Sequence, residues 1–188
     1  MLRSLPVIAL ALALSACGTP SRPPLLSVGV THTMNGPSLR TAIVQSAERL
    51  ALRTLEVDGV TFDPDPVGFA RAVFWTEEID LFDAEVAADP NAEGVAIVLE
   101  SARKRGQLHQ DAPRPGDLAF FSDASGAPAM VAVVVDASDT EFDIVGWFRG
   151  GPERVRLRAG RRTPLGSLLV DKAAVPIERR LLTFADPF

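Results

Sequence analysis

The sequence predicts an α+β domain in which N-terminal helices pack on a C-terminal antiparallel meandering sheet. Apolar residues recur with helical spacing up to Gly106, and short apolar runs separated by Gly/Ser/Asp-rich turns follow it. One later segment, 154–158, alternates strictly between arginine and apolar residues. Helices followed by consecutive strands are typical of α+β folds. The 188 residues, 47% of them hydrophobic, suffice for one domain with a substantial core.

The N-terminus has the pattern of an exported precursor. A basic start precedes an apolar run at 5–14, which is too short to span a bilayer as a mature helix. The motif Leu-Ser-Ala-Cys that ends at Cys17 then resembles the lipobox of bacterial lipoproteins. This resemblance implies that a signal peptide, 1–16, is removed and that Cys17 is lipidated. The alternative is an ordinary cleavable signal that happens to contain a cysteine.

The lipid predicted on Cys17 sets the expected location. Several acyl chains hold a protein on a membrane far more firmly than one chain does. By the same resemblance, Gly18 in place of aspartate favours the outer membrane, with the domain facing the periplasm. Residues 17–37 are rich in proline and glycine and are interpreted as a tether, although 25–30 could form a short strand.

The first predicted helix has Ser38 as its N-cap and ends before the turn signal Asp58-Gly59. Its expected buried face carries Leu39, Ile43, Ala47 and Leu50. The folded domain is therefore expected to span 38–188.

The second helix is predicted over 66–75, with Asp65 as its cap. Proline is tolerated at Pro66 because the first amides of a helix have no intrahelical partner. Arg71 is its only charged residue, so most of its surface must be buried. A third helix is predicted over 90–105, capped by Asp89 and closed by Gly106.

Strands are predicted after Gly106. They are expected at 118–121, 129–135, 142–148, 154–158 and 180–184.

The arginines of 154–158 are candidate binding residues. They are Arg154, Arg156 and Arg158, and they share one face of the predicted strand. They could bind phosphates of lipopolysaccharide or carboxylates of peptidoglycan peptides. The alternative is an edge strand that its charges protect from aggregation.

Composition excludes several classes of site. The single cysteine permits no intrachain disulfide, and with only His32 and His109 besides it, no metal site and no cofactor are predicted. The absence of tyrosine and a net charge of −5 argue against a nucleic-acid partner. His109 is interpreted as an exposed loop residue, with a relocated catalytic base as the alternative.

Two motifs resemble the papain-like cell-wall peptidases of the NlpC type and the related CHAP amidases. Residues 114–121 read Arg-Pro-Gly-Asp-Leu-Ala-Phe-Phe and resemble the family's first-strand motif. Residues 65–69 read Asp-Pro-Val-Gly-Phe, where the family has Asp-Cys-Ser-Gly-Phe. The resemblance covers about 38–158 and implies a papain-like fold.

The resemblance also implies that the catalytic residues are missing. The family's nucleophile is a cysteine that opens the buried helix, where the helix N-terminus and an imidazole lower its pKa. Pro66 takes the position of this cysteine and Met130 that of the histidine base, while Asp143 is the nearest candidate for the third, orienting residue. A cysteine peptidase is excluded if Cys17 carries the lipid, because no other cysteine exists.

Three functional hypotheses follow. The preferred one is a catalytically inactive envelope lipoprotein that binds a cell-wall peptide or a protein partner, or that scaffolds an active cell-wall enzyme. The second is a cell-wall amide hydrolase with a rebuilt site, for example Asp65 with His109. The third is a structural accessory lipoprotein of an envelope complex. Asp65 is a candidate binding residue in the preferred hypothesis.

Overall fold

The computed structural model describes residues 36–51, 55–91, 93–158, 168–170, 173–175 and 180–188. All of them belong to one unit, Met34–Phe188. The predicted signal peptide 1–16, the lipidation residue Cys17 and the tether up to residue 35 lie outside the described residues.

The helical part begins with α1, Gly36–Leu50, followed by the hairpin of β1, Glu56–Val57, and β2, Val60–Thr61. The first predicted helix is therefore confirmed, and Ile43, Ala47 and Leu50 of its apolar face are buried. Ser38 is not its N-cap, however. The helix already includes Gly36 and Pro37, so Ser38 lies in its first turn.

Helix α2, Pro66–Trp75, has the predicted bounds. Its cap is Asp65, whose Oδ1 accepts a hydrogen bond from the backbone N–H of Gly68 at 2.7 Å. Pro66 occupies the first turn, where no amide donor is needed. Most of the helix is buried, as its apolar sequence requires.

The third predicted helix begins later than expected. Residues Ala84–Ala87 form a separate short helix, α3, and α4 spans Val95–Lys104. The N-cap of α4 is Gly94, at φ 52°, while Asp89 accepts a hydrogen bond from the Asn91 amide in a local turn. The predicted start at Pro90 was wrong because Asp83 caps α3 and the chain turns before α4.

The end of α4 was predicted correctly. Gly106 has φ 69° and its N–H donates to the carbonyl of Arg103, while the N–H of Gln107 donates to the carbonyl of Ala102. This pair of bonds is a Schellman motif, which satisfies the last carbonyls of a helix and favours glycine at its turning point.

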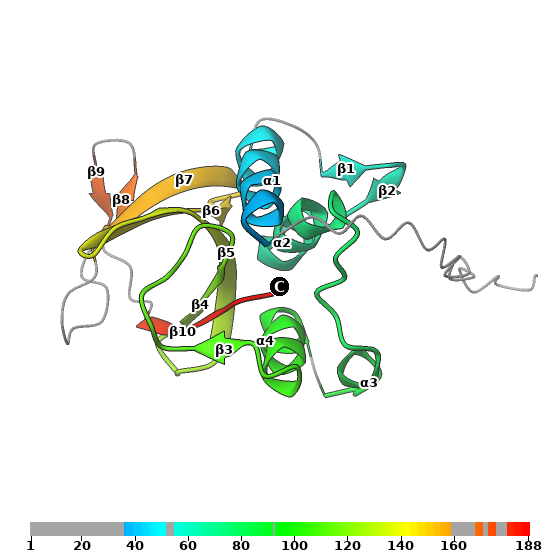
Figure 1. Cartoon of the computed structure of the whole chain (residues 1–188). Coiled ribbons are helices and arrows are strands. Elements are labelled where there is room, and N and C mark those ends of the chain that lie inside the picture. The colour runs from blue at the N-terminus through cyan, green and yellow to red at the C-terminus, as the bar shows by residue number, and fades with distance from the viewer. Residues whose placement is uncertain (1–35, 52–54, 92, 159–167, 171–172, 176–179) are drawn as a thin grey trace, which may run out of the picture. The chain divides into compact units, whose positions relative to one another are not determined.

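The second half of the domain is an antiparallel sheet with strand order β3-β10-β4-β5-β6-β7-β8-β9 (Figure 1). Strands β4 to β7 form the predicted meander, and β8 and β9, which were not predicted, continue it. Strand β10 returns to pair between β3 and β4. The bounds are β3 Leu108–His109, β4 Leu118–Ser122, β5 Pro128–Ala137, β6 Glu141–Phe148, β7 Gly151–Arg158, β8 Leu168–Val170, β9 Ala173–Val175 and β10 Arg180–Ala185.

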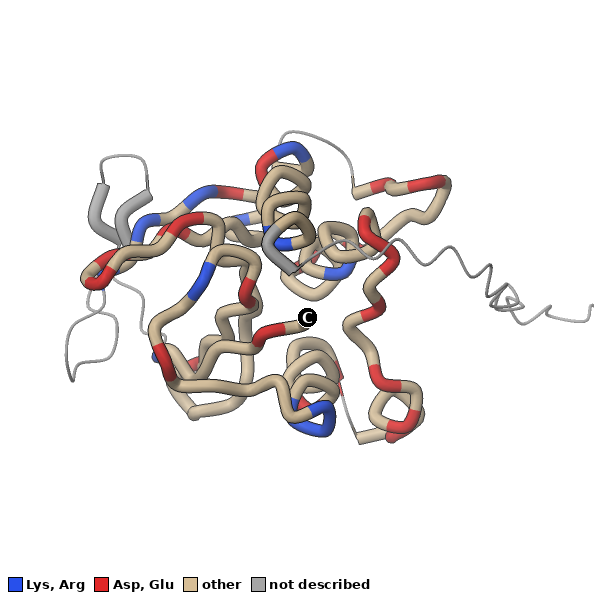
Figure 2. Tube along the Cα trace, in the orientation of Figure 1, with Lys and Arg blue, Asp and Glu red and all other residues tan. Residues whose placement is uncertain are grey.

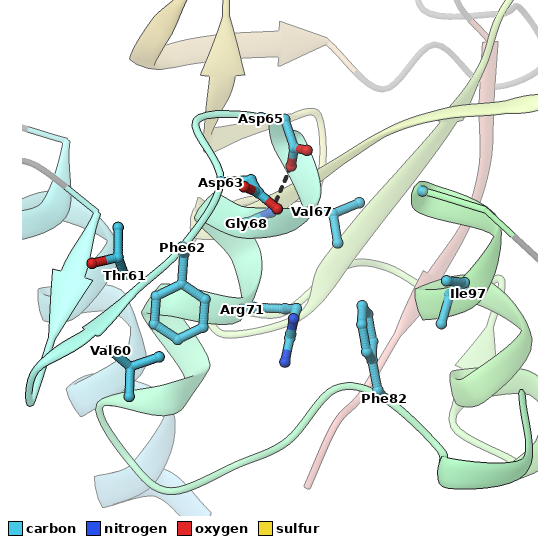
Figure 3. Close-up of a pocket in the computed structure, with 11 residues that line it drawn as sticks. Val60, Thr61, Phe62, Asp63, Asp65, Val67, Gly68, Arg71, Phe82 and Ile97 are labelled. Carbon is cyan, nitrogen blue, oxygen red and sulfur yellow. Dashed lines mark hydrogen bonds between the residues drawn. The ribbon is translucent and has the colours of Figure 1, made fainter. Parts of the chain in front are cut away.

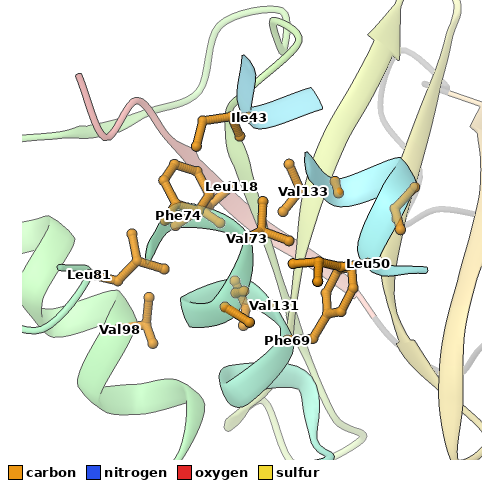
Figure 4. Packing of buried hydrophobic residues seen from close by; sticks show 14 of the residues in the cluster. Ile43, Leu50, Phe69, Val73, Phe74, Leu81, Val98, Leu118, Val131 and Val133 are labelled. Carbon is orange, nitrogen blue, oxygen red and sulfur yellow. The ribbon is translucent and has the colours of Figure 1, made fainter. Parts of the chain in front are cut away.

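The two faces of the sheet have separate apolar clusters. Val131 and Val133 of β5 pack with α1, α2 and α4, and Figure 4 shows them beside Phe69 and Val73 of α2. Met130, Ala132 and Val134 of the same strand belong to the cluster on the opposite face. Side chains alternate along a strand, so neighbouring residues of β5 serve different cores. The molecule is thus an α+β domain with helices on one face of an antiparallel sheet.

Candidate functional site

A pocket of about 330 Å³ lies beside the first turns of α2 (Figure 3). We call it the α2 pocket. Its walls come from β2 and the loop after it, from α2 itself, and from the segments before α3 and α4. The lining residues are Val60, Thr61, Phe62, Asp63, Asp65, Val67, Gly68, Arg71, Phe82, Gly94 and Ile97.

Gly68 holds the loop before α2 tightly against the start of the helix. A Cβ on Gly68 would lie 2.0 Å from the backbone oxygen of Asp63, so only glycine permits this approach. The two carboxylates of the loop are both exposed. Asp65 is engaged as the helix cap, whereas the Asp63 side chain makes no hydrogen bond or ion pair with a described residue. The pocket therefore has one free carboxylate at its edge.

Arg71 reaches into the pocket between two aromatic rings. Its guanidinium carbon lies 4.1 Å from the ring centroid of Phe82 and 5.7 Å from that of Phe62, and Figure 3 shows the side chain between them. Both distances fall in the range of cation–π contacts. No described carboxylate or carbonyl accepts a hydrogen bond from Arg71, although Asp63 and Asp65 line the same pocket.

Phe82 is held in place from α4. The guanidinium of Arg105 donates to the carbonyls of Asp80 and Phe82 at 2.9 and 2.7 Å. Lys104 pairs with Asp83 at 2.8 Å, and this hydrogen bond lowers the pKa of the Asp83 carboxyl. The loop that carries one wall of the pocket is thus fixed by two basic residues at the C-terminal end of α4, Lys104 and its C-cap Arg105.

The structure places Pro66, Met130 and Asp143, the three positions compared with the family's catalytic residues, in different surroundings. Pro66 opens α2, as the predicted helix bounds require, and lies beside the α2 pocket. Met130 is fully buried in the cluster on the sheet face away from the helices, so the structure does not bring it together with Pro66. Asp143 lies on the helix-side face of β6.

Asp143 is engaged by two arginines of the next strand. Arg156 Nε donates to its Oδ1 at 2.7 Å, and Arg154 Nε donates to its Oδ2 at 3.0 Å. The Asp143 side chain is 5% exposed, and the hydrogen bond from Arg156, helped by that from Arg154, holds the pKa of its carboxyl below the ordinary value. Asp143 therefore has ion-pair partners in place of an imidazole.

Arginines alternate along β7 as predicted (Figure 2). Their charges are paired with carboxylates. Arg154 also pairs with Glu48 of α1 at 2.8 Å, and Arg158 pairs with Glu141 at 2.9 Å. Strand β7 is not an edge strand, because it pairs with β8 in the sheet, with Arg156 opposite Leu169. The edge-protection interpretation is wrong for this reason.

A second polar group surrounds Asp117, the aspartate of the Pro-Gly-Asp turn. We call it the Asp117 cluster. Asp117 is 0% exposed; its Oδ1 accepts from Arg40 at 2.7 Å and its Oδ2 from the backbone N–H of Arg114 at 2.7 Å. His109 Nε2 lies 3.2 Å from Oδ2, and Arg40 also pairs with Asp186 near the C-terminus.

His109 is therefore not the exposed loop residue expected from the sequence. It lies on β3, its side chain is 19% exposed, and its ring stacks on Phe184 with a centroid distance of 5.8 Å. His109 lines a pocket of about 320 Å³ with Leu99, Arg103 and Thr183, whereas Asp65 lines the α2 pocket. The structure does not bring together the Asp65–His109 pair of the rebuilt-site hypothesis.

Comparison of the chain with protein-family models, curated proteins and solved structures gives no match. Within the described ranges, no group of three or more His, Cys, Asp and Glu residues is arranged to hold a metal ion. No helix among the same residues is both long enough and apolar enough to cross a membrane.

The sequence pointed to Asp63 and Asp65 at the edge of the α2 pocket, but it did not predict that Phe62, Arg71 and Phe82 form its wall. Phe62 and Phe82 lie 20 positions apart and meet only through the fold. The available signal was Arg71, because a single cation in an otherwise apolar helix is costly to bury without a partner.

Proposed function

We propose that this protein is a non-catalytic member of the papain-like NlpC/CHAP group that binds a cell-wall peptide without cutting it. The observation that carries the proposal is Pro66 at the first position of α2, beside a pocket whose described lining includes no cysteine, serine or histidine. The Thr61 hydroxyl lines the pocket, but no imidazole lines it to activate that hydroxyl. Proline has no side-chain nucleophile, and an imidazole base needs to lie within hydrogen-bond reach of the group that it activates.

Two features of the fold support the kinship. The buried helix that begins at the Asp-Pro-Val-Gly-Phe motif packs on the strands that follow the Pro-Gly-Asp turn. Asp117 of that turn is completely buried and receives hydrogen bonds from the turn itself and from α1. Both motifs thus have architectural roles that do not depend on a catalytic cysteine.

The proposal places the protein on the periplasmic side of the outer membrane, held by lipid on Cys17. Intact-mass analysis of the chain purified from membranes tests this part. We expect a mature chain that begins at Cys17 and carries acyl groups. An unmodified Cys17 would contradict it.

Peptidoglycan tests the functional part directly. The full lipoprotein, kept soluble in detergent, is incubated with purified peptidoglycan, which is then sedimented while the supernatant is analysed by mass spectrometry. We expect the protein to sediment with the cell wall and no fragments to be released. Fragments released in proportion to the protein would favour a rebuilt amide hydrolase. A protein that stays in solution would favour an accessory of an envelope complex.

A further inference from the structure

Arg71 has hydrogen-bonding capacity that the described structure leaves unused. A guanidinium carries five N–H donors, and the cation–π contacts of Arg71 with Phe62 and Phe82 use none of them as hydrogen bonds. These donors therefore stay available to a planar acceptor. A carboxylate is such an acceptor, since its two oxygens match the spacing of two parallel N–H donors.

The surroundings of Arg71 disfavour a strongly anionic ligand. Between Glu56 and Ala87, Arg71 is the only basic residue, and acidic residues recur throughout this segment (Figure 2). Asp63 and Asp65 line the same pocket, so a phosphate dianion would meet two like charges for one unlike charge. A ligand that also carries a positive group avoids this repulsion.

Asp63 is the group that would meet this positive charge. Its carboxylate is exposed and unpaired among the described residues, whereas one oxygen of Asp65 already caps α2. Neither carboxylate lies within 4.0 Å of an Arg71 nitrogen, so the two signs of charge are held apart across the pocket. The volume of about 330 Å³ is at the lower end of the range for small-molecule sites and suits a ligand of a few residues.

We propose that the α2 pocket binds a short zwitterionic peptide, with a free carboxylate on Arg71 and an ammonium group near Asp63. This inference rests on the proposed function and narrows the peptide class. Phe62 and Phe82 are positioning residues that orient the guanidinium, and Arg105 is a positioning residue that holds the loop of Phe82.

Isothermal titration calorimetry with the dipeptide Ala-Lys and with its C-terminal amide tests the inference. The wild-type lipoprotein is expected to bind Ala-Lys and to bind the amide about tenfold or more weakly, because the amide removes the charged, bidentate acceptor. Equal binding of the two probes, or binding of neither, overturns the inference. Sedimentation with peptidoglycan, measured in parallel, reports on the proposed function separately.

Variants locate the effect. Arg71→Lys keeps the charge but loses the planar fork, so we expect Ala-Lys binding to weaken about tenfold or more, with an unchanged thermal midpoint. Asp63→Asn is expected to weaken binding of the same peptide and to leave the thermal midpoint unchanged. Arg103→Lys is the matched control, since Arg103 lies on α4, is 58% exposed and pairs with Glu100. Wild-type affinity in Arg71→Lys would overturn the assignment.

Discussion

Two arginines in this domain lie over phenylalanine rings but differ in the acceptors that their N–H donors reach. Arg40 lies 4.7 Å from the ring centroid of Phe188, and Arg71 lies 4.1 Å from that of Phe82. The donors of Arg40 reach Asp117, Asp186 and the carbonyl of Pro115. The donors of Arg71 reach no described acceptor.

This difference distinguishes polar groups that stabilise the fold from polar groups that are available to a ligand. Buried polar groups in proteins are almost always satisfied internally, and the Asp117 cluster follows that rule with a fully buried carboxylate whose two oxygens are both engaged. The α2 pocket has the same residue types, an arginine, aspartates and phenylalanines, without the internal pairs. Arg40 and Asp117 use their hydrogen bonds to join distant segments of the chain, whereas Arg71 and Asp63 are available to a ligand.

The largest expected difference in stability is between two single variants, Arg40→Ala and Arg71→Ala. Arg40→Ala leaves the buried Asp117 carboxylate without its guanidinium, and we expect the free energy of unfolding to fall by about 3 kcal/mol. Arg71→Ala removes a cation–π contact from a partly exposed side chain and should cost about 1 kcal/mol or less. Urea denaturation measures both. Equal losses would show that the two arginines are both structural.

An intermediate effect is expected from Gly68→Ala. The new Cβ would lie 2.0 Å from the Asp63 carbonyl oxygen, so the loop must move away from α2 at a cost of about 1–3 kcal/mol. The same movement should weaken Ala-Lys binding, because it displaces Asp63. Gly151→Ala is the control, since its Cβ would meet nothing within 4 Å. Unchanged stability and binding in Gly68→Ala would contradict the close packing described for this loop.

The smallest expected effect is the contribution of Asp143 to the free energy of unfolding, which depends on pH. Its pKa is lowered in the folded protein by hydrogen bonds from Arg156 and Arg154, so the pair contributes stability above the ordinary aspartate pKa. That contribution is lost as the pH falls through the lowered pKa. Asp143→Asn should cost about 1 kcal/mol near pH 7 and should flatten the dependence of the free energy of unfolding on pH below about pH 5.

Denaturation series at several pH values check this prediction. Asp139→Asn is a suitable control, because Asp139 is exposed and pairs with no described residue. In the Asp139→Asn protein, the free energy of unfolding should fall with decreasing pH as steeply as in the wild type. An Asp143→Asn protein with that same slope would show that the arginine pairs of β7 do not contribute to acid stability.

Local signals in the sequence were enough to predict α2 and the end of α4. Asp65, Pro66 and Gly68 lie within one turn of one another, and the bonds that they make or permit are local. The strands were predictable for a similar reason, since alternation and intervening turns are properties of short segments. The start of α4 was not, because the Asp83 cap and its bonds to α4 redirect the chain before Gly94.

The candidate site was only half predictable. The motif at 65–69 located the start of α2 at Pro66, but the sequence could not tell that Met130 faces the other core, since shifting the register by one residue reverses the face. It also could not distinguish the roles of His109 and Asp65, which line different pockets.

By itself, the sequence determined that this chain forms an α+β domain and that its buried helix begins at Pro66. The tertiary structure alone decided which charges are satisfied. Arg40 and Asp117 are 77 positions apart, and no local pattern indicates that they meet or that Arg71 meets no described acceptor. Capping and periodicity depend on neighbours in the chain, whereas the pairing of buried charges depends on which distant segments folding brings together.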